Sequence, residues 1–177
     1  MQTVKMVISG AVNAGKTQFI RAISEIEVVS TERKATDDTK DIKKETTVAM
    51  DFGRISVGDD LVLHLFGTPG QKRFDFMWEI LSEGMLGLIV LVDSTRPETF
   101  RETNRIIDFF TAYRDAPYVI AANKQDHENA WSPDELRLAL RLNSDVKILP
   151  CVATERETVK NVLLELLYVI MQRSTEE

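Results

Sequence analysis

The stretch Val4–Ile20, VKMVISGAVNAGKTQFI, decides the fold of this 177-residue chain. Its first residues form a short, mostly apolar run that predicts a buried strand, and a helical pattern begins at Lys16. Between them lies GAVNAGKT, Gly10–Thr17, which matches the pattern G-x-x-x-x-G-K-T in the strand, loop and helix context that the pattern requires. The stretch therefore predicts a phosphate-binding loop near the start of an α/β domain.

Each residue type in this loop has a chemical reason. Gly10 and Gly15 let the backbone approach phosphates closely, so that successive N–H groups and the helix N-terminus point at negative charge. Lys16 can reach the outer phosphates, and the Thr17 hydroxyl can ligate magnesium. A glycine turn followed by an unrelated lysine is the alternative interpretation. The residues to which we assign phosphate binding are Gly10, Asn13, Ala14, Gly15, Lys16, Thr17 and Gln18.

Strand and helix patterns alternate along the rest of the chain. The stretch 28–45 is rich in charged residues and is expected to be a surface loop. The predicted strands are 4–9, 47–57 at an edge, 61–66, 85–92, 118–122 and 147–152, and the predicted helices are 16–26, 74–83, 98–113, 133–142 and 159–171. This alternation predicts one α/β domain over residues 1–177, with about six strands in a mostly parallel sheet and helices on both faces. Ligands of such sheets lie beyond the carboxyl ends of the strands.

The composition limits the expected partners and location. The net charge is -6, from 22 basic and 28 acidic residues, which gives no long-range attraction to nucleic acid or anionic lipid. Cys151 is the only cysteine, so no internal disulfide can form, and we expect a buried, inert thiol. The sequence has no signal peptide, lipidation motif or membrane-length apolar run, which favours a cytoplasmic protein without an intrinsic membrane anchor.

A second motif indicates which base is bound. AANKQD follows the predicted strand 118–122 and puts Asn123, Lys124 and Asp126 at its carboxyl end. A carboxylate there can accept hydrogen bonds from guanine N1–H and the 2-amino group together, whereas adenine lacks both donors in that arrangement. A site built for this pair rejects the analogue because a buried acceptor would be left without a partner. Taken alone, NKQD could be a solvated loop; behind a phosphate loop it predicts guanine selection.

These motifs, together with TTVAMDFG, GTPGQKRF and CVATERETV, occur in the order found in small Ras-like GTPases, and the resemblance covers nearly the whole chain. The chain looks most like prokaryotic members related to the MglA-like group, several of which act with roadblock-type partners. The resemblance implies that Thr47, or its neighbour Thr46, ligates magnesium and senses the γ-phosphate. It further implies that Gly70 donates its N–H to the γ-phosphate and that Gln71 orients the attacking water.

The same resemblance assigns roles at the base. Asn123 would brace the site, Lys124 would pack along the base and Asp126 would fix the guanine. Ala153 would offer its backbone N–H to the guanine oxygen, although Val152 and Thr154 replace the usual neighbours of this alanine.

Two positions depart from the family pattern. Gly67 stands where many relatives have an aspartate that holds a magnesium-bound water, and loss of such a group typically costs about 10–100-fold in metal affinity or activity. We therefore expect weaker magnesium binding; Asp93 could compensate through water, or could instead cap a turn. Val12 should crowd the space that a catalytic glutamine and an arginine need, so hydrolysis without a partner is expected at on the order of 10⁻⁴ per second or below.

The function expected from these features is a GTP-binding molecular switch with Mg²⁺ as cofactor. It would hydrolyse GTP to GDP slowly and signal to a regulatory protein, roadblock-type by resemblance, through segments near 30–47 and 67–84. Arg33, Arg54 and Arg73 are possible sources of a catalytic arginine, but none has a distinctive spacing. A non-hydrolysing GTP-binding module and an ATP-dependent phosphotransferase are the alternatives.

Overall fold

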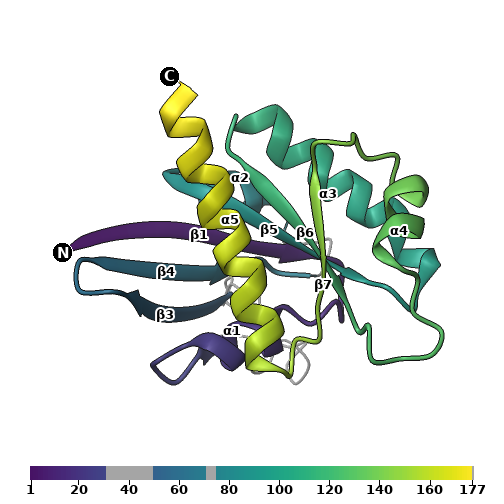
Figure 1. Ribbon diagram of the computed structural model, residues 1–177, viewed down its shortest axis with the longest axis horizontal. Coiled ribbons are helices and arrows are strands. Elements are labelled where there is room, and N and C mark those ends of the chain that lie inside the picture. The colour runs from purple at the N-terminus through teal and green to yellow at the C-terminus, as the bar shows by residue number, and fades with distance from the viewer. Residues whose placement is uncertain (31–49, 71–74, 177) are drawn as a thin grey trace, which may run out of the picture.

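The computed structural model describes residues 1–30, 50–70 and 75–176, which form a sheet covered by helices on both faces (Figure 1). The elements in chain order are β1 (Gln2–Gly10), α1 (Lys16–Ile23), β2 (Val29–Ser30), β3 (Asp51–Val57), β4 (Leu61–Gly67), α2 (Phe76–Ser82), β5 (Met85–Asp93), the 3-10 helix η2 (Pro97–Thr99), α3 (Phe100–Tyr113), β6 (Tyr118–Asn123), α4 (Pro133–Ala139), β7 (Lys147–Pro150) and α5 (Arg156–Glu176).

The described residues build a seven-stranded sheet in the order β2-β3-β4-β1-β5-β6-β7. Strand β1 pairs in parallel with β4 and β5, and the parallel pairing continues through β6 to β7. Only β2 and β3, at one side, run antiparallel to their neighbours. The expected α/β fold with a mostly parallel sheet is confirmed, and the carboxyl ends of β1, β5 and β6 lie along the same edge.

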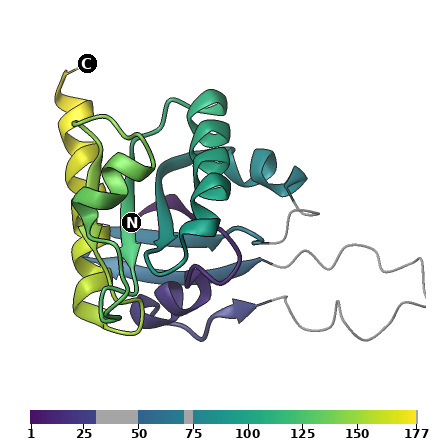
Figure 2. The same cartoon turned by 90° about the vertical axis from the view of Figure 1, so that its right-hand side faces the viewer.

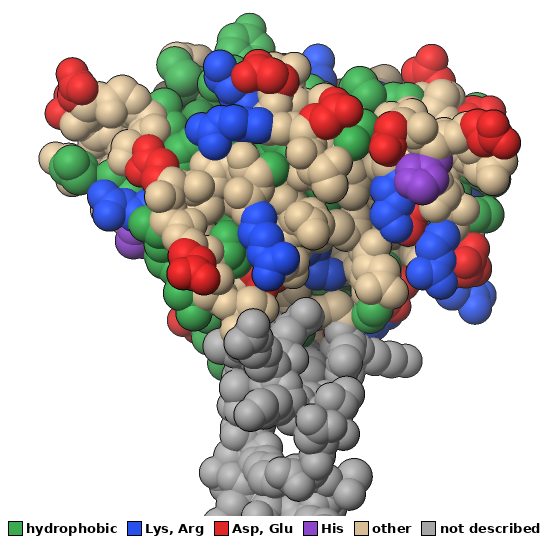
Figure 3. Space-filling view, turned by 90° about the horizontal axis from the view of Figure 1, so that it is seen from below, with side chains coloured by type: hydrophobic (Ala, Val, Ile, Leu, Met, Phe, Trp, Pro, Cys, Tyr) green, Lys and Arg blue, Asp and Glu red, His purple; other side chains and the backbone are tan. Residues whose placement is uncertain are grey.

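A hydrophobic cluster fills each side of the sheet. Helices α1 and α5 pack on one face, where Phe19, Ile20 and Leu166 are fully buried. Helices α2, α3 and α4 cover the opposite face with residues such as Trp78 and Ile106. Figure 2 shows the two layers with the sheet between them. The outer surface is mixed in charge: acidic and basic side chains are interspersed over the described part of the face in Figure 3.

The boundaries differ from the prediction where tertiary contacts decide them. Strand β3 was expected at the sheet edge, but the two-residue strand β2 pairs with it, and a strand that short has no readable alternation. Helix α1 ends at Ile23 instead of residue 26 because the Ser24 hydroxyl accepts a hydrogen bond from Arg54 N at 3.1 Å and so ties the chain to β3.

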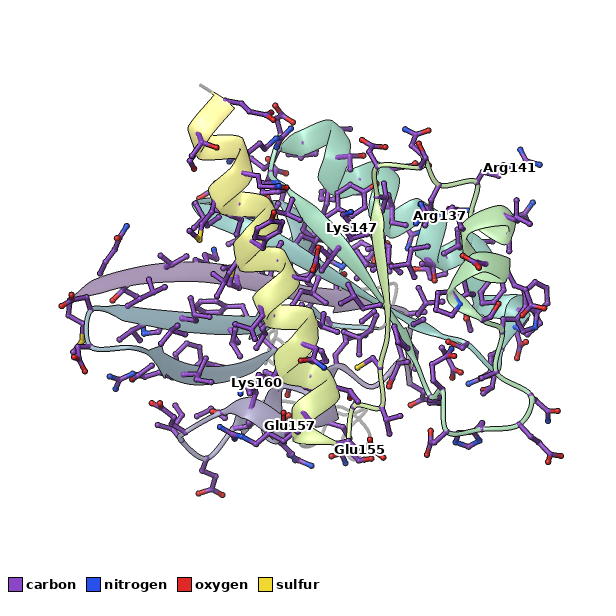
Figure 4. All side chains as sticks on the ribbon, viewed as in Figure 1. Arg137, Arg141, Lys147, Glu155, Glu157 and Lys160 are labelled. Carbon is purple, nitrogen blue, oxygen red and sulfur yellow. The ribbon has the colours of Figure 1, made fainter. Side chains whose placement is uncertain are left out.

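Helix α4 illustrates how local signals set an element. Ser132 caps it: its hydroxyl accepts from Glu135 N, and the Glu135 carboxylate accepts from Ser132 N at 2.7 Å. Arg137, labelled on this helix in Figure 4, donates to the carbonyls of Asn143 and Val146 and so closes the connection to β7. Among the described residues, no helix combines the length and apolar character needed to span a membrane.

The core packing of α5 generates a stability prediction. Leu166 is fully buried, and a Cβ added at Gly87 of β5 would lie 3.0 Å from its Cδ1, so the helix sits directly on the sheet here. Leu166→Ala should lower the free energy of unfolding by about 2–5 kcal/mol because it leaves a cavity in this contact. Urea denaturation should detect the change. Leu164→Ala, on the same helix but 48% exposed, is the control and should cost much less; equal losses would contradict this packing.

Candidate functional site

The loop between β1 and α1 is shaped by backbone positions that few residues tolerate. Gly15 has φ 106° and precedes the helix, and a Cβ there would lie 2.3 Å from Asn123 Nδ2. Only glycine avoids both the strained conformation and the clash. Asn13 also has positive φ, at 64°. The loop thus turns tightly around the N-terminus of α1, which is the arrangement that the G-x-x-x-x-G-K-T pattern predicts.

The predicted phosphate-binding side chains gather at this turn. The Lys16 side chain is buried, and its Nζ donates to the carbonyls of Gly10 at 2.5 Å and Ala11 at 2.9 Å. Thr17 and Gln18 lie in the first turn of α1, with Gln18 exposed. A cation over the loop and a helix N-terminus together suit a polyphosphate.

Gly70 reaches the same loop from the end of β4. A Cβ added at Gly70 would lie 3.0 Å from both Lys16 Nζ and Val12 Cα, so this backbone touches the phosphate loop. The Val12 side chain is also close, with Cγ2 3.2 Å from that Cβ position. The Val12 side chain, which was predicted to crowd the catalytic space, therefore lies close to the Gly70 backbone.

Asn123 connects the loop to the neighbouring strand tip. Its Nδ2 donates to Ala14 O at 2.7 Å, and its Oδ1 accepts from Ala153 N at 2.9 Å. The side chain is almost fully buried, so both hydrogen bonds are sheltered from water. The bracing role implied for Asn123 matches this geometry. The Ala153 N–H was expected to meet guanine; here it is engaged by Asn123 instead, so a base contact would require this hydrogen bond to be shared or opened.

Lys124 is fixed beside the strand tip by Asp93. Its backbone has φ 65°, and its Nζ donates to Asp93 Oδ2 at 2.6 Å. Asp93 Oδ1 accepts from both the N–H and the hydroxyl of Thr95. Burial acts to raise the pKa of Asp93, but these hydrogen bonds outweigh it and hold the pKa below its ordinary value. With both oxygens engaged, Asp93 caps the turn after β5, which is the alternative role considered for it; its compensation for Gly67 stays a prediction.

Asp126 lies exposed in the turn that follows β6. Gln125 holds this turn, since its N–H donates to Cys151 O and its Nε2 donates to Trp131 O at 2.8 Å. Cys151 is buried as expected, and burial raises its pKa to about 11, so its thiol stays protonated at neutral pH. The turn therefore presents the Asp126 carboxylate at the same sheet edge as the phosphate loop.

Three predicted residues lie outside the described part of the chain: Thr46, Thr47 and Gln71. The same holds for most of the first expected switch segment. In the second segment, α2 buries Trp78 but leaves Phe76 and Ile80 exposed.

Sequence reasoning missed Arg96. It lines a cavity of about 310 Å³ together with Val12 and Gly70, and its Nε pairs with Glu98 at 3.1 Å. The three arginines considered from sequence do not include it: Arg54 lies on β3, and Arg33 and Arg73 fall outside the described residues. Its position after β5, in STRP, was the available signal.

Sequence reasoning also missed Asp51. This carboxylate begins β3, is 5% exposed and accepts a hydrogen bond from the Thr17 hydroxyl through Oδ2 at 2.5 Å. Its other oxygen, Oδ1, is buried and has no hydrogen-bond partner among the residues that the structure describes. Within those residues, no cluster of three or more His, Cys, Asp or Glu side chains could hold a metal ion by itself.

Comparison with known proteins gives the family. A family model described as conserved hypothetical ATP binding protein matches residues 26–173. The uncharacterized protein MJ1339 of Methanocaldococcus jannaschii is 33% identical over 127 residues, which cover 70% of this chain and 71% of that protein. Ras-related proteins also match: SEC4 of Candida albicans is 27% identical over 138 residues, covering 75% of this chain and 66% of SEC4. Rab-18-B of Danio rerio is 24% identical over 178 residues, covering 97% and 81%.

The fold has a solved counterpart. The Arl6 BBS3 small GTPase of Trypanosoma brucei, solved with the bound nucleotide analogue GppNp, superimposes with a TM-score of 0.76 at 18% identity, covering 97% of this chain and 99% of that one. The likeness to MglA-like members stays a prediction. The chain belongs to the family described as conserved hypothetical ATP binding proteins, and its nucleotide-binding fold is that of the Ras-like small GTPases.

Proposed function

We propose that this protein is a GTP-binding molecular switch that hydrolyses GTP to GDP slowly and signals to a protein partner. The observation that carries the proposal is the Asn123 bridge, which joins the phosphate loop at Ala14 to the strand tip that bears Lys124 and Asp126. A loop suited to phosphates and a carboxylate suited to guanine thereby belong to one site. Elsewhere in the fold family, Ras-related proteins and a small GTPase with a bound nucleotide analogue are similar to this chain.

Guanine, rather than adenine, is the base that we assign to the site. The family description names ATP, but it covers the chain without specifying the residues that would read the base. Asp126 supplies the paired acceptor that guanine requires, and Lys124, fixed by Asp93, offers an aliphatic stem beside it. An adenine would leave that carboxylate facing no donor.

The chain offers oxygen and nitrogen groups of the type that a magnesium–nucleotide complex needs. Lys16 and the N–H groups of Gly15, Thr17 and Gly70 would hold the phosphates, and Thr17 and Thr47 would ligate the ion. Hard oxygen ligands fit Mg²⁺, and the buried oxygen of Asp51 that has no hydrogen-bond partner among the described residues is consistent with an ion or its water close by. Bound Mg²⁺ would neutralise charge on the transferring phosphate.

Switching would follow from the two segments near 30–47 and 67–84. Contacts of Thr47 and Gly70 with a γ-phosphate would be made with GTP and lost with GDP, so a partner could read the nucleotide. The exposed Phe76 and Ile80 on α2, in the second of these segments, give such a partner an apolar contact. By resemblance we propose a roadblock-type regulator and a cytoplasmic location.

A non-hydrolysing GTP-binding module is the second candidate. The observation in its favour is Val12, whose side chain lies against Gly70, where the water-orienting Gln71 follows. A branched side chain at this point would keep a catalytic water or a partner's arginine away from the phosphate.

Base selection is tested by competition for labelled nucleotide. Unlabelled GTP should displace labelled GDP at least about 10²-fold better than ATP does, because only guanine satisfies Asp126. Asp126→Asn should abolish this preference and favour xanthine nucleotides, whose 2-oxo group can accept from the new amide. His127→Asn, which introduces the same side chain at the next exposed position, should leave the preference intact. Equal or stronger competition by ATP would contradict guanine selection.

Hydrolysis is tested by single turnover of GTP bound to the purified protein. The wild type should release phosphate at on the order of 10⁻⁴ per second, and Gln71→Ala should slow release by about 10²-fold because the attacking water loses its orientation. Gln172→Ala, on the exposed side of α5, is the control. If Gln71→Ala leaves the rate unchanged, the non-hydrolysing alternative is the better account.

A further inference from the structure

Asp51 is a buried carboxylate that the fold itself does not explain. It is 5% exposed at the start of β3, and only one of its two oxygens has a partner among the described residues. Burying a carboxylate with an unsatisfied oxygen is costly unless a cation or a donor sits beside it. Among the described residues, no Lys or Arg side chain forms an ion pair with Asp51, so a bound cation could supply the compensating charge.

The partner that Asp51 does have is the expected magnesium ligand. Thr17 Oγ1 donates its proton to Asp51 Oδ2 at 2.5 Å. A threonine hydroxyl has one proton and two lone pairs, and it binds a metal ion through a lone pair. Directing the proton to Asp51 therefore leaves the lone pairs of Thr17 available for the ion, in an orientation fixed by the carboxylate.

The position of Asp51 is related to Gly67 by strand pairing. In the antiparallel pair of β3 and β4, Asp51 stands directly opposite Gly67. A Cβ added at Gly67 would lie 3.2 Å from Asp51 Cβ and 3.5 Å from Asp51 Oδ2. The Asp51 side chain therefore lies next to the space that a side chain at position 67 would occupy. The carboxylate that β4 lacks at Gly67 is thus present on the neighbouring strand β3, at Asp51.

We propose that Asp51 is the acidic residue of the magnesium site, in place of the aspartate that Gly67 lacks. This inference rests on the proposed nucleotide-binding function. Through Oδ2, Asp51 orients the Thr17 hydroxyl toward the ion, and through Oδ1 it accepts a hydrogen bond from a water of the ion's hydration shell. Asp51 is a positioning residue: it acts on magnesium affinity through Thr17 and water, and it leaves base recognition to the opposite side of the site.

The test measures how magnesium controls nucleotide release. Release of fluorescent GDP, and in parallel fluorescent ADP, is followed while free Mg²⁺ is titrated. For whichever nucleotide the wild type retains, Mg²⁺ should slow release. Asp51→Asn, which keeps the size but removes the charge, should move the Mg²⁺ midpoint upward by about 10–100-fold. In EDTA, release from Asp51→Asn and from the wild type should be equally fast, since the ion is absent from both.

Moving the carboxylate from position 51 to position 67 distinguishes a role of Asp51 in positioning Thr17 and water from a general loss of folding stability. Gly67→Asp alone should be destabilised, because its Cβ would be crowded by Asp51 Cβ and by Ile20 Cδ1 at 3.0 Å. The double variant Asp51→Gly with Gly67→Asp returns the acid to β4 and frees the space, and it should recover most of the Mg²⁺ sensitivity. Asp59→Asn, the same replacement on the exposed turn of this hairpin, is the control and should keep the wild-type midpoint.

The outcomes distinguish this inference from the proposed function. Retention of ADP instead of GDP would refute guanine selection but would leave the Asp51 test in force. An unchanged Mg²⁺ midpoint in Asp51→Asn would overturn the inference while guanine binding stands. If Asp51→Asn does not fold, the double variant Asp51→Gly with Gly67→Asp provides the test. If Mg²⁺ does not slow nucleotide release from that double variant, the inference is also overturned. A wild type that retains neither nucleotide would overturn both.

Discussion

The hydrogen bonds of the Asn123 side chain hold the two halves of the site together. One amide group satisfies the Ala14 carbonyl in the phosphate loop and the Ala153 N–H beside β7, so three separate segments share a buried side chain. The close approach requires glycine at position 15, whose absent side chain makes room for the amide. The G-x-x-x-x-G-K-T and NKQD motifs are therefore one structural unit, although more than a hundred residues separate them along the chain.

The features that sequence predicted best are those with local causes. The phosphate loop and the buried strand predicted over 85–92, found as β5 over Met85–Asp93, each depend on the pattern of neighbouring residues, so they could be predicted directly. The alternation of strand and helix patterns then predicted the mostly parallel sheet, which the structure confirms. Boundaries such as the end of α1 at Ile23 were missed because a distant residue, Arg54, sets them through Ser24.

Asp51, the acidic residue that we propose for a magnesium site, was harder to find from the sequence because strand pairing, and no motif, relates it to Gly67. The motif alone shows a glycine at position 67, where many relatives have an aspartate, and for this reason Asp93 was considered as the compensating carboxylate. The short connection after Val57 sets the register of the hairpin: Val57 faces Leu61, so Asp51 faces Gly67. Counting outward from that turn would have revealed the carboxylate. Arg96 shows the same limitation, since only the fold brings η2 beside Val12.

The length of the connection from Gly58 to Asp60 determines how the residues of β3 and β4 pair, as far as Asp51 and Gly67 at the other end of the hairpin. Surface turns usually accept insertions with little harm, and Gly58 has open space around it. Here one extra residue that shifted the pairing of β3 would turn Asp51 to the opposite face of the sheet, away from Thr17. On the role proposed for Asp51, selection on the length of this turn would reflect ion binding at the other end of the hairpin.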